Sequence, residues 1–200
     1  REWVLAMTST PTAFKGKGTL WNMAHMLDYV MRPNAKLRSL LRNARRAARL
    51  RPGSVGVHIR RGEACDPANA RFCGSPEEVL VAVRTVLDKY NATSAYIATD
   101  DPSVIGQLQR LAPDVHWSFL ESFNRTQLNQ GWTQILLTRM GQLDRRVVAE
   151  STFLDLFLLS ECSFLVGQFS SAFFRTAFAL SVADKGFVPP FLGLDGPPAW

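Results

Sequence analysis

Hydrophobic and polar residues along the chain recur in segments whose spacing changes from that of a helix to that of a strand and back. Between residues 34 and 50, leucines and alanines fall at three- and four-residue intervals with arginines between them, which predicts an amphipathic helix capped by Asn34. Arg51-Pro52-Gly53 ends this helix, and the alternating apolar residues from Ser54 to Ile59 predict a strand. The pattern therefore begins with one helix-to-strand step.

The same alternation continues through the rest of the chain. Ser75-Pro76-Glu77-Glu78 has the form of a capping box with proline at the first helical position, and it predicts the start of a further helix. The other expected elements are strands at 94–98, 115–120 and 163–169, and helices at 102–111, 147–161 and 172–183. The stretch 124–143 has a poor pattern, and we interpret it as a mobile loop that can hold a short helix.

Strands that alternate with helices of this length predict an α/β fold, a Rossmann-like parallel sheet with helices on both faces. In such sheets, ligands bind outside the carboxyl ends of the strands. Arg60 and Arg61 follow one predicted strand, the pair Asp100-Asp101 follows a second, and Ser170-Ser171 follows a third. We therefore expect these three pairs to meet at one edge of the sheet.

Size and composition are those of one globular domain without a membrane span. The chain has 200 residues, of which 46% are hydrophobic and 20% are charged. Its longest apolar stretches fall well short of the roughly 20 residues that cross a bilayer. The sequence begins with Arg-Glu-Trp-Val-Leu rather than with methionine. We therefore expect a fragment of a longer protein, with any membrane anchor outside this chain.

The net charge of +6 comes from one segment and does not favour a nucleic-acid partner. Ten of the 23 Lys and Arg residues lie between Arg32 and Arg61 with no Asp or Glu among them, whereas the rest of the chain carries 13 basic and 17 acidic residues. The basic segment contains no Phe, Trp or Tyr, and so it lacks the aromatic platform on which single-strand binders stack bases. We expect no nucleic-acid partner.

Two glycosylation sequons agree with the lumen of the secretory pathway, and the cysteines permit one disulfide. Cys65 and Cys73 flank a short loop that a disulfide could close, whereas Cys162 in an apolar run indicates a buried thiol. Asn91 and Asn124 each begin an Asn-X-Thr sequon. No histidine has metal-ligand spacing to a cysteine, so we expect no metal site.

Several polar residues each permit a ligand-binding and a structural interpretation. Arg60 and Arg61 are suited to hold a diphosphate, and equally to pair with Asp100 or Asp101. Ser170-Ser171 opens a helix, where it could attract an anion or only cap the helix. The occurrence of the arginine pair together with the serine pair favours the binding of phosphate.

Three further features are less specific. Asp155 interrupts an apolar helix face, and its partner could be a ligand base or an arginine. His58 lies in a strand of Val and Ile, where the default is a core histidine with satisfied hydrogen bonds. Lys15-Gly-Lys-Gly-Thr19 lacks the full spacing of a phosphate loop and is interpreted as a basic loop.

Four stretches stand out in order along the chain: Tyr29-Val-Met-Arg-Pro33, Val55-Gly-Val-His-Ile-Arg-Arg61, Ala98-Thr-Asp-Asp-Pro102, and the run from Leu154 to Ser171. Together they resemble the alpha-1,6-fucosyltransferases and their relatives among the GDP-fucose-dependent transferases. The resemblance extends over roughly residues 28–183. It implies a two-domain, GT-B-like transferase of the Golgi or secretory-pathway lumen, with residues 1–30 as a connecting segment and 31–200 as the GDP-sugar-binding domain.

The resemblance also implies roles for individual residues. His58 and Asp155 would read the guanine, while Arg60 and Ser171 would hold the β-phosphate. Arg61, Ser170, Asp100 and Asp101 would complete the donor site. Such enzymes are inverting and metal-independent, with GDP-fucose as the donor substrate, no further cofactor, and a glycan or glycoprotein as acceptor; Arg60 would stabilise the leaving group.

One departure from the family pattern affects catalysis. After the two arginines the family reads Thr-Asp-Lys, whereas this chain reads Gly62-Glu63-Ala64-Cys65-Asp66, so the family's catalytic lysine is missing. Glu63 or Asp66 could take the acceptor proton as general base, and Glu63 is our candidate. The alternative is a catalytically inactive transferase-like domain that binds nucleotide or glycan.

Overall fold

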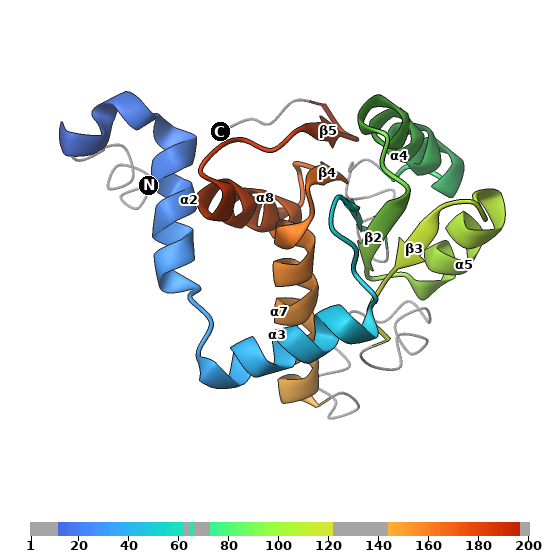
Figure 1. Cartoon of the computed structure of the whole chain (residues 1–200), viewed down its shortest axis with the longest axis horizontal. Coiled ribbons are helices and arrows are strands. Elements are labelled where there is room, and N and C mark those ends of the chain that lie inside the picture. The colour runs from blue at the N-terminus through green and yellow to red at the C-terminus, as the bar shows by residue number, and fades with distance from the viewer. Residues whose placement is uncertain (1–11, 62–64, 66–72, 122–143, 197–200) are drawn as a thin grey trace.

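The computed structural model describes residues 12–61, 65, 73–121 and 144–196 (Figure 1). Its elements, in chain order, are the 3-10 helix η1 (Thr12–Lys17), α2 (Thr19–Val30), α3 (Ala35–Ala47), β1 (Val55–Ile59), α4 (Pro76–Tyr90), β2 (Ser94–Thr99), α5 (Pro102–Leu111), β3 (His116–Ser118), α7 (Arg145–Glu161), β4 (Phe164–Gly167), α8 (Ala172–Lys185) and β5 (Phe191–Gly193). The stretch 124–143, expected as a loop, lies outside the described residues.

The five strands form one parallel sheet in the order β3-β2-β1-β4-β5. Strands β1 and β2 are buried along their whole length, as expected for central strands with helices on both faces. This confirms the predicted α/β fold. Because β2, β1 and β4 are neighbours and run in the same direction, the residues that follow them emerge at one edge.

Helices cover both faces of the sheet (Figure 1). On one face, α4 and α5 pack against Val55, Val57 and the other residues of the same parity in β1 and β2. On the opposite face, α7 and α8 cover a second cluster that includes Tyr96 and Ala98. The period of two in the strands thus separates two cores, and the paired positions Gly56–Tyr96 and His58–Ala98 face the α7–α8 side.

The local signals for helix starts are confirmed. The Asn34 side chain accepts a hydrogen bond from the Leu37 amide at the start of α3. Ser75 and Glu78 form the predicted capping box of α4. Asp101 caps α5, directly before the proline that opens this helix.

The N-terminal part differs from the expectation. Lys15 to Thr19, expected as a basic loop, instead belongs to η1 and to the start of α2. Helix α2 packs along α8, with Ala24 fully buried and Leu20 and Leu27 partly buried at helical spacing. The edge strand β5 is a second element that the sequence pattern did not predict.

None of the helices in the described ranges combines the length and the apolar character that crossing a membrane requires. The division of the chain at residue 30 stays a prediction.

Candidate functional site

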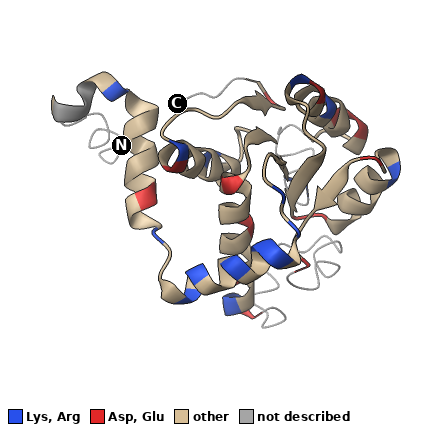
Figure 2. Ribbon diagram, viewed as in Figure 1, with Lys and Arg blue, Asp and Glu red and all other residues tan. Residues whose placement is uncertain are grey.

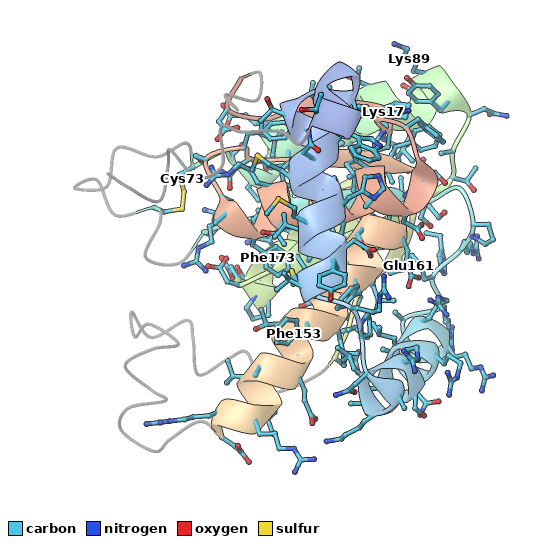
Figure 3. The ribbon with its side chains drawn as sticks, turned by 90° about the vertical axis from the view of Figure 1, so that its left-hand side faces the viewer. Lys17, Cys73, Lys89, Phe153, Glu161 and Phe173 are labelled. Atoms are coloured by element: carbon cyan, nitrogen blue, oxygen red, sulfur yellow. A yellow bond between two sulfur atoms is a disulfide. The ribbon has the colours of Figure 1, made fainter. Side chains whose placement is uncertain are left out.

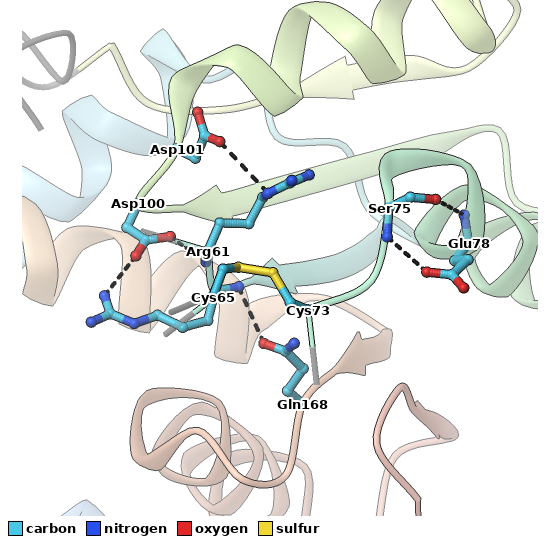
Figure 4. Close-up of a disulfide and its surroundings, with 9 residues drawn as sticks. Arg61, Cys65, Cys73, Ser75, Glu78, Asp100, Asp101 and Gln168 are labelled. Carbon is cyan, nitrogen blue, oxygen red and sulfur yellow. Dashed lines mark hydrogen bonds and ion pairs between the residues drawn. A yellow bond between two sulfur atoms is a disulfide. The ribbon is translucent and has the colours of Figure 1, made fainter. Parts of the chain in front are cut away.

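The three predicted pairs of polar residues lie at the carboxyl edge of the sheet, where β2, β1 and β4 end side by side. Figure 4 shows Arg61, Asp100 and Asp101 at this edge. Arg60 and Arg61 directly follow β1, and Asp100 and Asp101 follow β2. The β4–α8 connection carries Ser170 and Ser171. The sequence-based expectation that these segments share one edge is therefore confirmed.

The two arginines are paired with the two aspartates. Arg60 Nη1 lies 2.8 Å from Asp100 Oδ2, and Arg61 Nε lies 3.7 Å from Asp101 Oδ2. The backbone N–H of Arg61 also donates to Asp100 Oδ1 at 2.8 Å. The Arg60 side chain nevertheless keeps 32% of its surface exposed, so an anion can reach it. The structural and the ligand-binding interpretations of this pair are thus compatible.

Burial raises the pKa of the Asp100 carboxyl, and the charge of Arg60 and the Arg61 amide oppose that rise. Because burial disfavours the charged form of Asp100, its ionisation depends on the nearby positive charge of Arg60. Asp100 therefore fixes both the backbone and the guanidinium that follow β1.

His58 is buried, and its Nδ1 atom has no hydrogen-bond partner among the described residues. The ring stacks on Phe173 and Phe174 of α8, with centroid distances of 5.0 and 6.0 Å. Burial, followed by the charge of Arg60, lowers the pKa of His58 to about 3. His58 is thus a neutral imidazole with one orphaned nitrogen rather than the satisfied core histidine that the default predicts, and an orphaned buried polar atom needs a ligand or another partner.

Asp155 is buried on α7 and accepts a hydrogen bond from the hydroxyl of Tyr96 at 2.6 Å. Tyr96 is thus a partner of Asp155 of a kind that the sequence did not suggest, beside the two options of a ligand base and an arginine. Tyr96 lies on the same face of the sheet as His58, because Tyr96 pairs with Gly56 in register. Asp155 and His58 consequently both belong to the α7–α8 side.

The β4–α8 connection presents the start of a helix to the same edge. Ser171 is the N-cap residue of α8, yet its side chain makes no capping hydrogen bond. The first N–H groups of a helix have no acceptor within the helix, and they favour an anion. The amides of Phe169 and Ser170, directly before the cap, donate to Asp195.

Two residues of this edge were missed from the sequence. Gln168 Oε1 accepts from the backbone N–H of Arg60 at 3.3 Å, and the only signal for it was a polar residue within an apolar strand (Figure 4). Asp195 follows β5, the strand that the pattern did not predict, and so it carried no signal.

Cys65 and Cys73 form a disulfide beside Arg61, a pairing that the sequence permitted but left open (Figure 4). Cys162 is free and buried, and burial raises the pKa of its thiol. Glu63 and Asp66, the candidate bases, lie outside the described residues. Within the described ranges, no three His, Cys, Asp or Glu side chains cluster as metal ligands.

A cavity of about 330 Å³ lies elsewhere, lined by α3 and by the ends of α7 and α8 that include Glu161 and Asp184. Its arginines belong to the basic face of α3 (Figure 2). Arg45 is already paired with Glu161. Figure 3 shows Glu161 on the opposite side of the molecule from Cys73. Since α8 has 14 residues and rises by about 1.5 Å per residue, its last residue is roughly 20 Å from its first. This cavity is therefore separate from the candidate site.

Comparison with known proteins relates this geometry to a family. The fold is similar to that of POFUT1 in complex with GDP-fucose, with a TM-score of 0.54, 12% identity, and coverage of 80% of this chain and 46% of that one. For POFUT1 in complex with GDP, the TM-score is 0.53 and the identity is 14%, with coverage of 80% of this chain and 48% of that one. At this identity the likeness concerns the fold, and the chain spans less than half the length of these structures.

The sequence comparison is more specific than the comparison of folds. Residues 6–187 match the family described as "Alpha-(1,6)-fucosyltransferase N- and catalytic domains". The match includes the two arginines, the two aspartates and the β4–α8 connection. The chain therefore belongs to the alpha-1,6-fucosyltransferase family.

Proposed function

We propose that this chain is the donor-binding half of a GT-B-like fucosyltransferase that transfers fucose from GDP-fucose to a glycan or glycoprotein, with inversion and without a metal ion. The proposal is carried by one observation: Arg60, the start of α8 without a side-chain cap, and a His58 nitrogen that has no partner among the described residues lie at one sheet edge. The family match and the GDP-fucose and GDP complexes of POFUT1 support it.

The diphosphate is assigned to Arg60 and Ser171. Arg60 is partly exposed at the strand exit, and its fork of N–H donors matches phosphate oxygens. Ser171 begins α8 with its hydroxyl not engaged in capping, so that the hydroxyl and the first helical amides face the same anion. Arg61, Asp101 and Ser170 complete this side of the site.

The guanine is assigned to the α7–α8 side. The orphaned Nδ1 of His58 offers a hydrogen bond to the base edge, and Asp155 offers a carboxylate that can accept from the guanine amide edge. Tyr96 donates to one oxygen of Asp155 and so orients the carboxylate. Recognition of a base by buried polar groups favours guanine over bases without those donors.

In the transfer step, the acceptor hydroxyl oxygen attacks C1 of fucose as the bond from C1 to the β-phosphate oxygen breaks. The bonding electrons leave with GDP, and the acceptor proton passes to a general base. Arg60 neutralises the charge that develops on the β-phosphate, the role that a divalent cation has in other transferases. Glu63 is proposed as the base, with Asp66 as the alternative, because the family's lysine is absent after Arg61.

Localisation in the Golgi or secretory-pathway lumen is proposed on two features. The Cys65–Cys73 disulfide suits an oxidising compartment. Asn91, the first residue of a sequon, is exposed at the end of α4, where an oligosaccharide can be attached.

The missing lysine also favours a second candidate, a catalytically inactive relative that keeps the nucleotide pocket. Both candidates bind GDP, and they differ in whether the protein turns over GDP-fucose. GDP release from GDP-fucose, measured beside its release from other GDP-sugars, distinguishes them. Hydrolysis that is faster with GDP-fucose than with other GDP-sugars would support the active transferase.

Calorimetric titration with GDP tests the donor site. We expect Arg60→Ala to weaken GDP binding by at least tenfold, because a charged hydrogen bond to phosphate is worth about 1.5–3 kcal/mol. Arg84→Ala is the matched control, because Arg84 lies on α4, away from the edge, and forms a surface ion pair with Asp114. Absence of GDP binding, or equal binding by the wild type and Arg60→Ala, would contradict the proposal.

A further inference from the structure

Side chains from neighbouring strands hold the backbone amides along the carboxyl edge of the sheet. Asp100, after β2, accepts from the amide of Arg61, after β1. Gln168, after β4, accepts from the amide of Arg60. Asp195, after β5, accepts from the β4–α8 connection. The contacts thus follow the strand order β2-β1-β4-β5, and Asp195 forms the last of them.

Asp195 binds two consecutive amides with its two oxygens. Oδ1 accepts from Phe169 N at 2.7 Å, and Oδ2 accepts from Ser170 N at 2.8 Å. From the other side, Arg175 Nη1 donates to the carbonyl of Phe169 at 2.6 Å. The peptide groups directly before α8 are therefore fixed through both their donors and an acceptor, which sets the direction in which α8 begins.

The turn that carries Asp195 is built for this contact. Leu194 N donates to Gly167 O at 2.9 Å and so extends the β4–β5 pairing to the turn. A Cβ on Gly193 would lie 2.1 Å from the carbonyl oxygen of Gly196, and Gly196 itself has a φ of 105°. Both positions require glycine. The two glycines therefore allow a tight turn that places Asp195 beside the β4–α8 connection.

The Asp195 carboxylate remains ionised at neutral pH. Its partial burial raises the pKa, but the Ser170 side chain and the amides of Ser170 and Phe169 outweigh that effect and lower it. A fixed negative charge close to a diphosphate site would by itself weaken the binding of an anion. Any benefit of Asp195 to donor binding must therefore come from the geometry that it imposes.

We propose that Asp195 is a positioning residue of the donor site, which holds Phe169 and Ser170 so that Ser171 and the first turn of α8 are aligned with the β-phosphate. The inference rests on the proposed function. It assigns Asp195 no contact with the donor, because the amides and the Ser170 side chain take up its oxygens.

The ratio of the affinities for GDP and GMP tests this role, since only GDP carries the β-phosphate. Asp195→Asn keeps the size of the side chain, removes its charge and leaves one oxygen for the two amides. We expect calorimetry to show GDP binding weakened about tenfold with GMP binding within about twofold of wild type. Asp88→Asn on α4 is the matched control, because Asp88 is exposed and far from this edge.

Three outcomes would contradict the inference or its basis. GDP binding by Asp195→Asn that equals or exceeds that of wild type would overturn the positioning role, because loss of repulsion would then dominate. Equal weakening of GDP and GMP would also overturn it, because the effect would not concern the β-phosphate. A wild type that binds neither nucleotide would contradict the proposed function itself.

A milder variant keeps the test decisive if Asp195→Asn does not fold. Asp195→Glu retains two acceptor oxygens and the charge but displaces them by one methylene. We expect it to weaken GDP binding about threefold, with GMP binding unchanged. Wild-type affinity of Asp195→Glu for GDP would show that the position of the carboxylate is immaterial, and it would overturn the inference.

Discussion

At the scale of single residues, His58 and Asp155 are buried polar groups among otherwise apolar neighbours. His58 is buried against two phenylalanine rings, and its Nδ1 has no hydrogen-bond partner in the described part of the chain; Asp155 is buried on an otherwise apolar helix face. An unsatisfied or charged buried group costs stability, and the cost is retained where the group has a function. His58 lies on the face of the sheet that α7, with Asp155, and α8 cover.

The depressed pKa of His58 predicts a loss of stability in acid. An unfolded histidine takes up a proton near pH 6.5, whereas burial holds the folded pKa at about 3. The unfolded state therefore binds more protons between these values. The contribution of neutral His58 to the free energy of unfolding is complete above pH 6.5. It falls as the pH drops toward 3, by at most about 1.4 kcal/mol per pH unit.

Urea unfolding of wild type and His58→Gln at several pH values measures this effect. Glutamine does not titrate, so the variant should lose less stability than wild type between pH 6.5 and 4. Parallel pH profiles would show that His58 does not account for the acid sensitivity.

Tyr96 provides a second prediction at this scale. Tyr96→Phe removes the hydroxyl that donates to the buried Asp155 carboxylate, and it should reduce the free energy of unfolding by about 1.5–3 kcal/mol. If Asp155 reads guanine, GDP binding should weaken while the preference for GDP over UDP narrows. Tyr90→Phe, on the exposed end of α4, is the control and should stay within about 0.5 kcal/mol of wild type. If Tyr96→Phe keeps the wild-type preference for GDP over UDP, Tyr96 has no role in base recognition.

At the scale of elements, the end of β4 links the sheet to the start of α8. A Cβ on Gly167 would lie 2.6 Å from the ring of Phe174, which in turn stacks on His58. The absence of a side chain at Gly167 therefore lets α8 approach the strand and sets the position of the histidine ring.

Gly167→Ala should therefore cost about 1–3 kcal/mol of stability through overpacking, and it should weaken GDP binding by displacing His58. Thermal unfolding and GDP titration measure the two effects. Gly106→Ala on α5 is the matched control, since its added Cβ meets only Arg110 at 3.5 Å and alanine favours the helix. A Gly167→Ala variant as stable as Gly106→Ala would contradict this account of the β4–α8 packing.

Helix starts were predictable from sequence because their signals are local. Asn34, Ser75 and Asp101 each bond an amide within three residues, so the pattern itself contains both partners. Helix α2 was missed because Trp21, Met23 and Met26 surround its buried stripe with further apolar residues, which blurs the helical period. Strand β5 has only three residues after two prolines, too few to show an alternation.

The edge of the site was predictable, but its internal contacts were not. Parallel strands place their carboxyl ends together, so the positions of Arg60, Asp100 and Ser171 follow from the order of elements. The contact of Tyr96 with Asp155 joins residues 59 positions apart, and that of Phe169 with Asp195 joins residues 26 apart. Such pairs depend on the final packing of helices on the sheet, which no local pattern encodes.

At the scale of the whole molecule, polar groups gather in two separate places. The carboxyl edge of the sheet carries the paired arginines, the start of α8 and the disulfide. The cavity beside α3 carries further arginines, but also Asp28, Glu161 and Asp184. Three carboxylates among its lining residues make this cavity a poorer place for a diphosphate than the edge, where the start of α8 adds its own positive potential.

A crystal structure of the chain with GDP distinguishes these two places most directly. We expect GDP at the carboxyl edge, with the β-phosphate hydrogen-bonded to Arg60 and the first turn of α8, and the guanine beside His58 and Asp155. GDP bound in the cavity between α3 and the ends of α7 and α8, or with its phosphates away from Arg60, would contradict it.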